Sequence, residues 1–265
     1  MNCRICHNES KRLFSKTILQ KYPADYFQCT SCGFIQTSDP VWFNEAYNSA
    51  ITSLDLGLLQ RNFEFLEPVS RIIDACFPES KTMLDYAGGY GVFVRLMRDR
   101  GFNYFRQDPY CENIFAKHFD SADHAISRFD VVTAFEVFEH FKDPSTELPT
   151  ILLNGNNIIF STVLIPANAA DIENWWYIAP ETGQHLSFYS RLSLEKLAAD
   201  FGKKFYSNGT NLHIFTDRSL DNKQLDYAFN GKLKEGFFKS KNSFIKERPS
   251  LLQSDFEYVR GLLNR

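Results

Sequence analysis

The sequence predicts an α/β protein whose sheet is mostly parallel and which carries a small cysteine-rich module at its N-terminus. Through the middle of the chain, short apolar runs alternate with segments of helical periodicity, the pattern of a parallel sheet covered by helices. Three glycines directly follow the first of these runs, and two Cys-x-x-Cys pairs precede it. With 265 residues the chain is long enough for one domain with additions or for two small domains.

Residues 1–40 contain the two cysteine pairs. Cys3 and Cys6 are separated by 22 residues from Cys29 and Cys32, a spacing typical of a tetrahedral four-cysteine zinc site. The segment between the pairs is strand-like, and so short a module would need the metal to fold stably. Disulfides are the competing interpretation, and His7 is a less favoured alternative ligand. We expect a zinc ribbon with a structural Zn²⁺.

Residues 41–80 form the next predicted segment, and most of it is helical by pattern. Between Leu54 and Phe77, apolar residues recur at spacings of three and four, as on the buried face of a helix. Pro78 ends the pattern. We expect one helix or a helix pair whose apolar stripe packs in a core.

Residues 81–94 predict a strand, a tight glycine-rich turn and a helix. The residues in and before the turn that we assign to cofactor binding are Asp85, Ala87, Gly88, Gly89 and Gly91. Glycine adopts positive φ at little cost and lets a ligand approach the backbone, while the following helix presents free N–H groups. A dinucleotide fingerprint would have glycine or alanine where this chain has Val94, which disfavours NAD and FAD.

The next two strands supply further acidic residues. A short strand ends at Asp108, 23 residues after Asp85, where nucleotide-binding α/β folds place a carboxylate on the ribose hydroxyls. The apolar run 129–135 predicts a buried strand that leads into Glu136, which we expect to line the cofactor site. For Glu139 and His140 two roles stay open: a place at the pocket, or capping and bracing of the following helix.

These motifs resemble those of class I S-adenosylmethionine-dependent methyltransferases. Asp85-x-Ala87-x-Gly89-x-Gly91 is similar to their first motif, with Ala87 in place of a glycine, and residues 129–144 closely resemble their F-D-V…E-V-x-E-H…D-P segment. The resemblance implies a Rossmann-like core over residues 81–216 that binds S-adenosylmethionine (SAM). The N-terminal cysteine pairs and the aromatic segment after them resemble the zinc-binding domain that precedes some deoxysugar and other small-molecule methyltransferases. In that family the helical segment covers the cofactor pocket.

Residues 165–192 are too long and too aromatic for a simple connection. We expect them to lie over the ligand crevice as a substrate loop, because loops of this length usually have a function. Trp175, Trp176 and Tyr177 would then offer a flat apolar wall on which sugar or aromatic rings could stack.

The segment 184–190 resembles the H-E-H-L-S-Y-(F/Y)-S signature of sugar C-methyltransferases. His185 matches the second histidine, whereas Gly183 and Gln184 replace the histidine and glutamate before it, so two acid–base groups are absent. An imidazole with a pKa near about 6.5 suits removal of a proton from an acceptor hydroxyl. His185 is therefore the candidate base, with Tyr189 orienting the substrate; the alternative is that His185 is a hydrogen-bonded structural group.

The remaining elements complete the fold. Residues 193–202 predict a helix that is N-capped at Ser193 and ends at a glycine, and residues 203–215 predict an antiparallel strand pair around Asn208-Gly209. Residues 217–265 are expected to be a helical extension. Its stretch 232–248 mixes basic residues with phenylalanines and predicts an amphipathic helix more than an RNA-binding surface.

Charge and hydropathy limit the function further. The formal net charge is −3, so the overall charge does not indicate a nucleic-acid partner. No stretch of the sequence is apolar enough to span a membrane. The first residues lack a secretory signal, so we expect a cytoplasmic location. The sequence predicts a SAM-dependent methyltransferase of a small molecule, and by resemblance a sugar or nucleotide-sugar of a surface-glycan or natural-product pathway. The alternatives are a zinc-containing RNA methyltransferase and a non-catalytic zinc- or cofactor-binding interaction protein.

Overall fold

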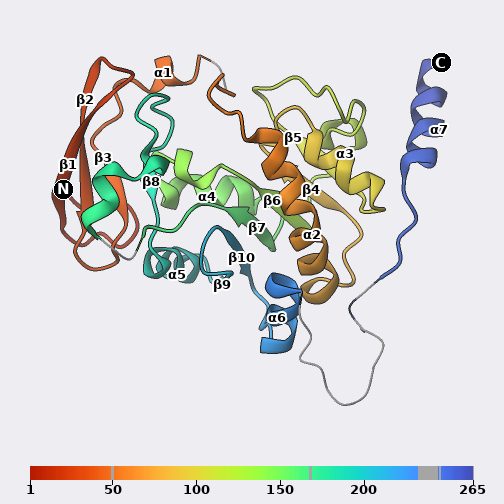
Figure 1. Cartoon of the computed structure of the whole chain (residues 1–265). Helices are drawn as coiled ribbons and strands as arrows, with labels where there is room; N and C mark the ends of the chain where they lie inside the picture. The colour runs from red at the N-terminus through yellow and green to blue at the C-terminus, as the bar shows by residue number, and fades with distance from the viewer. Residues whose placement is uncertain (49–50, 167–168, 232–243, 245, 265) are drawn as a thin grey trace. The chain divides into compact units, whose positions relative to one another are not determined.

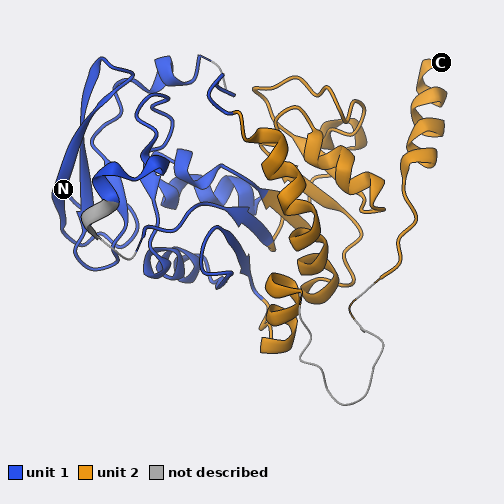
Figure 2. Ribbon diagram, viewed as in Figure 1, with its two compact units in different colours: residues 1–55, 134–153, 158–217 blue, residues 56–133, 154–157, 218–265 orange. Residues whose placement is uncertain are grey.

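The structure is a computed structural model that describes residues 1–48, 51–166, 169–231, 244 and 246–264 (Figure 1). The chain forms two compact units (Figure 2). Unit 1 contains residues 1–55, 134–153 and 158–217, and unit 2 contains residues 56–133, 154–157 and 218–265. Each unit combines segments that are distant in the sequence. The predicted division of the chain into the segments 1–40, 41–80, 81–216 and 217–265 stays a prediction.

The N-terminal part of unit 1 is a four-stranded antiparallel sheet with the order β1-β2-β3-β8. Its strands are β1 (Ser10–Ile18), β2 (Tyr22–Cys29), β3 (Ile35–Thr37) and β8 (Ser187–Phe188). The last strand belongs to the segment predicted as a substrate loop, and it pairs with β3 through Ile35 opposite Phe188. The loop is therefore part of the N-terminal sheet at this point.

The second sheet has six strands in the order β5-β4-β6-β7-β10-β9. Its strands are β4 (Met83–Tyr86), β5 (Tyr104–Gln107), β6 (Val131–Ala134), β7 (Ile158–Ser161), β9 (Lys204–Ser207) and β10 (Leu212–Thr216). Strand β4 is parallel to both β5 and β6, whereas β10 is antiparallel to both β7 and β9. The predicted α/β class and its antiparallel ending are confirmed.

The helices lie close to the positions that the sequence predicts. They are α1 (Phe43–Ala46), α2 (Leu58–Cys76), α3 (Val92–Asp99), α4 (Pro144–Leu152), α5 (Arg191–Asp200), α6 (Asn222–Asn230) and α7 (Leu252–Leu263). Helix α2 begins four residues after Leu54. The predicted N-cap at Ser193 is wrong: α5 is capped by Ser190, whose Oγ accepts a hydrogen bond from the Ser193 amide at 3.0 Å.

The predicted substrate loop also contains short helical segments. Residues 169–174 and 176–178 form the short 3-10 helices η3 (Ala169–Asn174) and η4 (Trp176–Ile178). Most of the predicted basic-aromatic helix, residues 232–243 and 245, lies outside the described residues. In the part of the chain that the structure describes, no helix is both long enough and apolar enough to cross a membrane.

Candidate active site

The glycine-rich turn of unit 2 follows β4 and leads into α3. Ala87, Gly89 and Gly91 all have positive φ, and Gly91 is the N-cap of α3 with φ of 83°. A Cβ on Gly91 would lie 2.6 Å from Asn113 Oδ1 and 3.2 Å from the Ala116 amide nitrogen, so a side chain does not fit there. Glycine at this position is required both for the backbone conformation and for close packing.

Asp108, the predicted ribose residue, lies directly against this turn. Its Oδ2 accepts a hydrogen bond from the Gly89 amide at 2.9 Å, while Oδ1 accepts from the Tyr110 and Cys111 amides at 2.8 and 3.0 Å. A carboxylate has about four lone-pair sites, so these three bonds leave room for a ligand hydroxyl. The carboxylate is thus fixed against the turn, and its predicted contact with a ribose stays a prediction.

Asp85 is buried beneath the turn. Its Oδ1 accepts a hydrogen bond from the Thr133 hydroxyl at 2.7 Å, and a Cβ on Gly88 would come within 2.8 Å of its Oδ2. Burial raises the pKa of Asp85 to about 7, with a smaller contribution from the negative charge of Asp108, while the Thr133 hydroxyl and Arg106 act in the opposite direction. The side chain supports the turn from below.

Arg106 is a residue of this site that the sequence analysis missed. It is 2% exposed, and its Nε donates to the Gly89 carbonyl at 2.6 Å. Its other nitrogens donate to the Asp120 carboxylate at 2.7 Å and to the Cys111 carbonyl. One guanidinium therefore ties the glycine-rich turn to the segment after Asp108; an arginine inside an otherwise buried strand was the available sequence signal.

Glu136 lies in unit 1, two residues after β6. It has φ of 54°, and its amide donates to Ser161 Oγ at 2.8 Å. The same hydroxyl donates to Glu136 Oε1 at 2.7 Å. The carboxylate is therefore fixed beside the carboxyl end of β7; its predicted contact with the cofactor stays a prediction.

His185 has a defined tautomer. Its Nδ1 is 2.6 Å from the Tyr177 carbonyl oxygen, which can only accept, so Nδ1 carries the proton. In the neutral imidazole, Nε2 is then the acceptor. The ring of His140 lies edge-on to it, with 5.2 Å between ring centroids, and His140 Nδ1 is hydrogen-bonded to the Tyr47 hydroxyl at 2.7 Å. Burial, followed by the nearby His185, lowers the pKa of His140 to about 3.

Glu139 is completely buried beside these histidines. Burial, followed by the negative charge of Glu136, raises the pKa of the Glu139 carboxyl well above its ordinary value. Of the two roles left open for Glu139 and His140, capping of the next helix is wrong. Asp143 is the N-cap of α4, since its Oδ1 accepts from the Ser145 amide at 3.0 Å, and Glu139 and His140 end the short 3-10 helix η2 (Phe138–His140).

The aromatic residues of the predicted substrate loop differ in exposure. Trp176 is 73% exposed, Trp175 packs partly buried on the core of unit 1, and Tyr177 is buried. The ring planes of Trp175 and Tyr177 are inclined by 40°, and those of Trp176 and Tyr177 by 74°, so the three rings are not coplanar. Tyr189 is buried and its hydroxyl donates to the Phe138 carbonyl at 2.8 Å. Their predicted substrate contacts stay predictions.

Comparison with known proteins identifies the family. A model of a methyltransferase-domain family matches residues 58–207, which is more than half of the 265 residues. The chain belongs to this methyltransferase family. The match covers the glycine-rich turn, Asp108 and the Glu139–His140 pair, and it identifies a class I, SAM-dependent methyltransferase domain.

Several solved methyltransferases have a similar fold. The magnesium protoporphyrin IX methyltransferase from Synechocystis PCC 6803 with bound S-adenosylhomocysteine (SAH) is 12% identical, with 66% of this chain and 92% of that chain covered and a TM-score of 0.43. A methyltransferase of calicheamicin biosynthesis with bound SAH is 16% identical, covers 66% and 61%, and has a TM-score of 0.40. The plantazolicin methyltransferase in complex with SAH is 12% identical, covers 68% and 95%, and has a TM-score of 0.40. A comparison with curated protein sequences finds no match.

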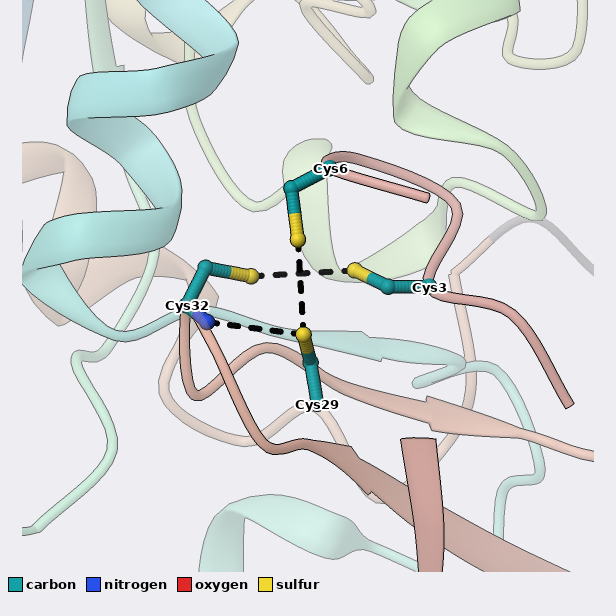
Figure 3. Close-up of side chains that lie close together, drawn as sticks. All are labelled: Cys3, Cys6, Cys29 and Cys32. Carbon is teal, nitrogen blue, oxygen red and sulfur yellow. Dashed lines mark hydrogen bonds between the residues drawn. The ribbon is translucent and has the colours of Figure 1, made fainter. Parts of the chain in front are cut away.

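The methyltransferase also carries the four predicted zinc ligands in one cluster. The sulfur atoms of Cys3, Cys6, Cys29 and Cys32 point toward one another (Figure 3), and none of these cysteines is in a disulfide. Sγ of Cys3 lies 3.6 Å from that of Cys32, and Sγ of Cys6 lies 3.4 Å from that of Cys29. These separations are close to those of thiolates around one tetrahedral zinc ion.

Backbone amides surround the cysteine cluster of the methyltransferase. The Ile5 amide donates to Cys3 Sγ, and the amides of Ser31 and Cys32 donate to Cys29 Sγ, each at 3.4 Å. Such N–H···S bonds stabilise thiolates, which are the form that binds zinc. The residues present therefore fit a structural Zn²⁺.

Proposed function

We propose that this SAM-dependent methyltransferase acts on a small-molecule acceptor, a sugar or nucleotide-sugar of a surface-glycan or natural-product pathway. The observation that supports the cofactor most directly is the bond between the Gly89 amide and the Asp108 carboxylate, because it fixes an acceptor for ribose hydroxyls at a turn that can hold a nucleotide. The acceptor class rests on the resemblance of residues 184–190 to the sugar C-methyltransferase signature.

The cofactor site in this proposal is built on the glycine-rich turn. The backbone of Ala87, Gly88, Gly89 and Gly91 would lie along the cofactor, Asp108 would bind the ribose and Asp85 would hold the turn from below. Glu136 is the further acidic residue that we assign to the cofactor. When bound, SAM supplies the electrophilic sulfonium methyl group.

His185 is the residue that we assign to deprotonation of the acceptor. Support for this role comes from its tautomer: with the Nδ1 proton donated to the Tyr177 carbonyl, Nε2 can accept a proton from a hydroxyl. Tyr189 would orient the substrate through the Phe138 backbone that it holds, and Trp175, Trp176 and Tyr177 would contact the acceptor ring.

Titration calorimetry with SAM and SAH tests this function. The zinc-loaded protein should bind both ligands, and Asp108→Asn should weaken binding by at least about tenfold, or about 1.4 kcal/mol. Asp130→Asn is the matched control, because Asp130 in the same unit also accepts backbone hydrogen bonds, from the Lys81 and Thr82 amides at 2.8 and 3.0 Å. It should bind SAM normally. Absence of binding by the intact protein would overturn the proposed cofactor.

The acceptor is then sought by a methyl-transfer screen against nucleotide-sugars, with RNA as the competing substrate class. Methylation of RNA in preference to nucleotide-sugars would overturn the proposed acceptor class and favour the alternative function, a zinc-containing RNA methyltransferase. Binding of SAM without methyl transfer to any acceptor would favour the other alternative, a non-catalytic zinc- or cofactor-binding interaction protein.

A further inference from the structure

Three side chains of unit 1 form a second possible metal site. Glu139 and His140 end η2, and His185 precedes β8 by two residues. Each offers one ligand atom, and the three ligand atoms lie within 4.8 Å of one another. They are separate from the four cysteines and include the residue that we assign as base.

The carboxylate of Glu139 is the strongest indication of a missing ligand. The residue is 0% exposed, and neither of its carboxylate oxygens makes a hydrogen bond of good geometry among the described residues. The hydroxyls of Tyr177 and Thr162 lie close enough to lower its pKa slightly, but no cation in the described part of the chain offsets its burial. A buried carboxylate without hydrogen bonds or a counter-charge is costly, and such groups are normally paired or coordinate a metal. A cation at the centre of the cluster would satisfy both oxygens.

The two histidines are held as metal-binding histidines usually are. His185 Nδ1 donates to the Tyr177 carbonyl at 2.6 Å, and His140 Nδ1 is hydrogen-bonded to the Tyr47 hydroxyl at 2.7 Å. An outer hydrogen bond on one ring nitrogen fixes the ring and makes the opposite nitrogen the ligand. Nε2 of His185 is therefore the atom that we assign to the metal. His140 also interacts with the Gln184 backbone, which raises its pKa, and this contact would be exchanged for the metal when Nε2 of His140 binds the ion.

We propose that Glu139, His140 and His185 bind a divalent transition-metal cation, such as Zn²⁺ or Mn²⁺. Two imidazoles and one carboxylate suit such ions, and three protein ligands leave coordination positions open for an oxygen of the acceptor. The ion would lower the pKa of a bound hydroxyl. In the metal-loaded protein His185 would be a ligand and not the base, and the proton of the bound hydroxyl would be released to solvent water.

This inference deepens the proposed function, because it concerns how the same acceptor would be bound and deprotonated. Its test does not need SAM or an acceptor. The protein could therefore bind SAM without binding the second metal ion, or bind the metal ion without binding SAM. The two proposals are tested separately.

The experiment is a Co²⁺ titration of the full-length protein after removal of metal under reducing conditions. The cysteine cluster should take one ion and give an intense thiolate-to-cobalt charge-transfer band. A second ion should then bind with only weak d–d bands, because its ligands are nitrogen and oxygen, and metal analysis should give two ions per chain. A single ion per chain, accounted for by the thiolate band, would overturn the proposal.

Variants assign the second ion to its ligands. Glu139→Gln and His185→Gln should each lose the second ion and retain the thiolate band, which reports that the cysteine cluster still forms. The controls are Glu147→Gln, whose carboxylate accepts from the Asp143 amide, and His213→Gln, whose buried ring bonds Ser207 and the Thr162 carbonyl. Both should keep two ions. Retention of the second ion by Glu139→Gln and His185→Gln would contradict the assignment.

Discussion

Single residues around the glycine-rich turn show how local geometry could prepare the cofactor site that we propose. Asp108 is useful there because backbone amides from the turn and from its own loop hold its carboxylate. Arg106 holds the same turn through a carbonyl group, since its guanidinium donates a hydrogen bond to the carbonyl oxygen of Gly89. Both charged groups hold the backbone of the turn through hydrogen bonds, and a preorganised turn lowers the entropic cost of binding the cofactor that we propose.

Replacement of Arg106 by glutamine should weaken SAM binding by about tenfold to a hundredfold, or about 1.4 to 3 kcal/mol, because the turn loses its anchor. Calorimetry measures the affinity and thermal unfolding measures the stability. Arg98→Gln is the matched control: Arg98 is also buried in unit 2, where it binds Asp255 at 2.6 and 2.8 Å without contacting the turn. An equal loss of affinity in both variants would show that general destabilisation is responsible.

Asp85 should make the stability depend on pH. Its folded-state pKa of about 7 lies above the ordinary value near about 3.9, so between these values the folded protein holds a proton that the unfolded chain has lost. The stability that Asp85 contributes is present below pH 4 or so, is lost as the pH rises to about 7 and stays lost above it.

The variant Asp85→Asn keeps a group that can accept from Thr133 but removes the titration. Relative to this variant, wild type should lose up to about 4 kcal/mol of unfolding free energy over that pH range, at about 1.36 kcal/mol per pH unit. Urea unfolding at a series of pH values measures the difference. Parallel pH profiles for the two proteins would contradict the buried, protonated state of Asp85.

At the scale of elements, local patterns in the sequence were sufficient to predict the positions of most strands and helices. Strand β5 ends at Gln107, one residue before the predicted end at Asp108, and α3 follows the glycines as expected. The pairing of β8 with β3 was not predicted. Two residues are too few to give a periodic signal, and their position in the sheet depends on burial of Phe188 in the aromatic core of unit 1.

The Zn²⁺ that we propose for the cysteine cluster should be needed for the N-terminal sheet, because the cluster joins the start of the chain to the end of β2. Chelation, or the variant Cys32→Ser, should lower the unfolding free energy by several kcal/mol and reduce the β-strand signal in circular dichroism. Cys111→Ser is the control, since Cys111 lies outside the cluster. Unchanged stability after complete loss of zinc would show that the sheet does not depend on the metal.

At the scale of the whole molecule, the fold class and the methyltransferase family could be predicted because their signals are local. A strand that ends at Asp85, glycines that permit positive φ and paired cysteines each act over a few residues, where sequence spacing fixes spatial spacing. The resemblance added the order of these motifs along the chain.

The sequence by itself determined the alternation of strands and helices, the glycine-rich turn with Asp108 and the two cysteine pairs. Only the tertiary structure decided that Arg106 anchors the turn, that β8 joins the N-terminal sheet and that Glu139, His140 and His185 meet. The physical reason is that these contacts join segments distant in sequence. Their formation depends on which buried surfaces pack together, and no local periodicity encodes that choice.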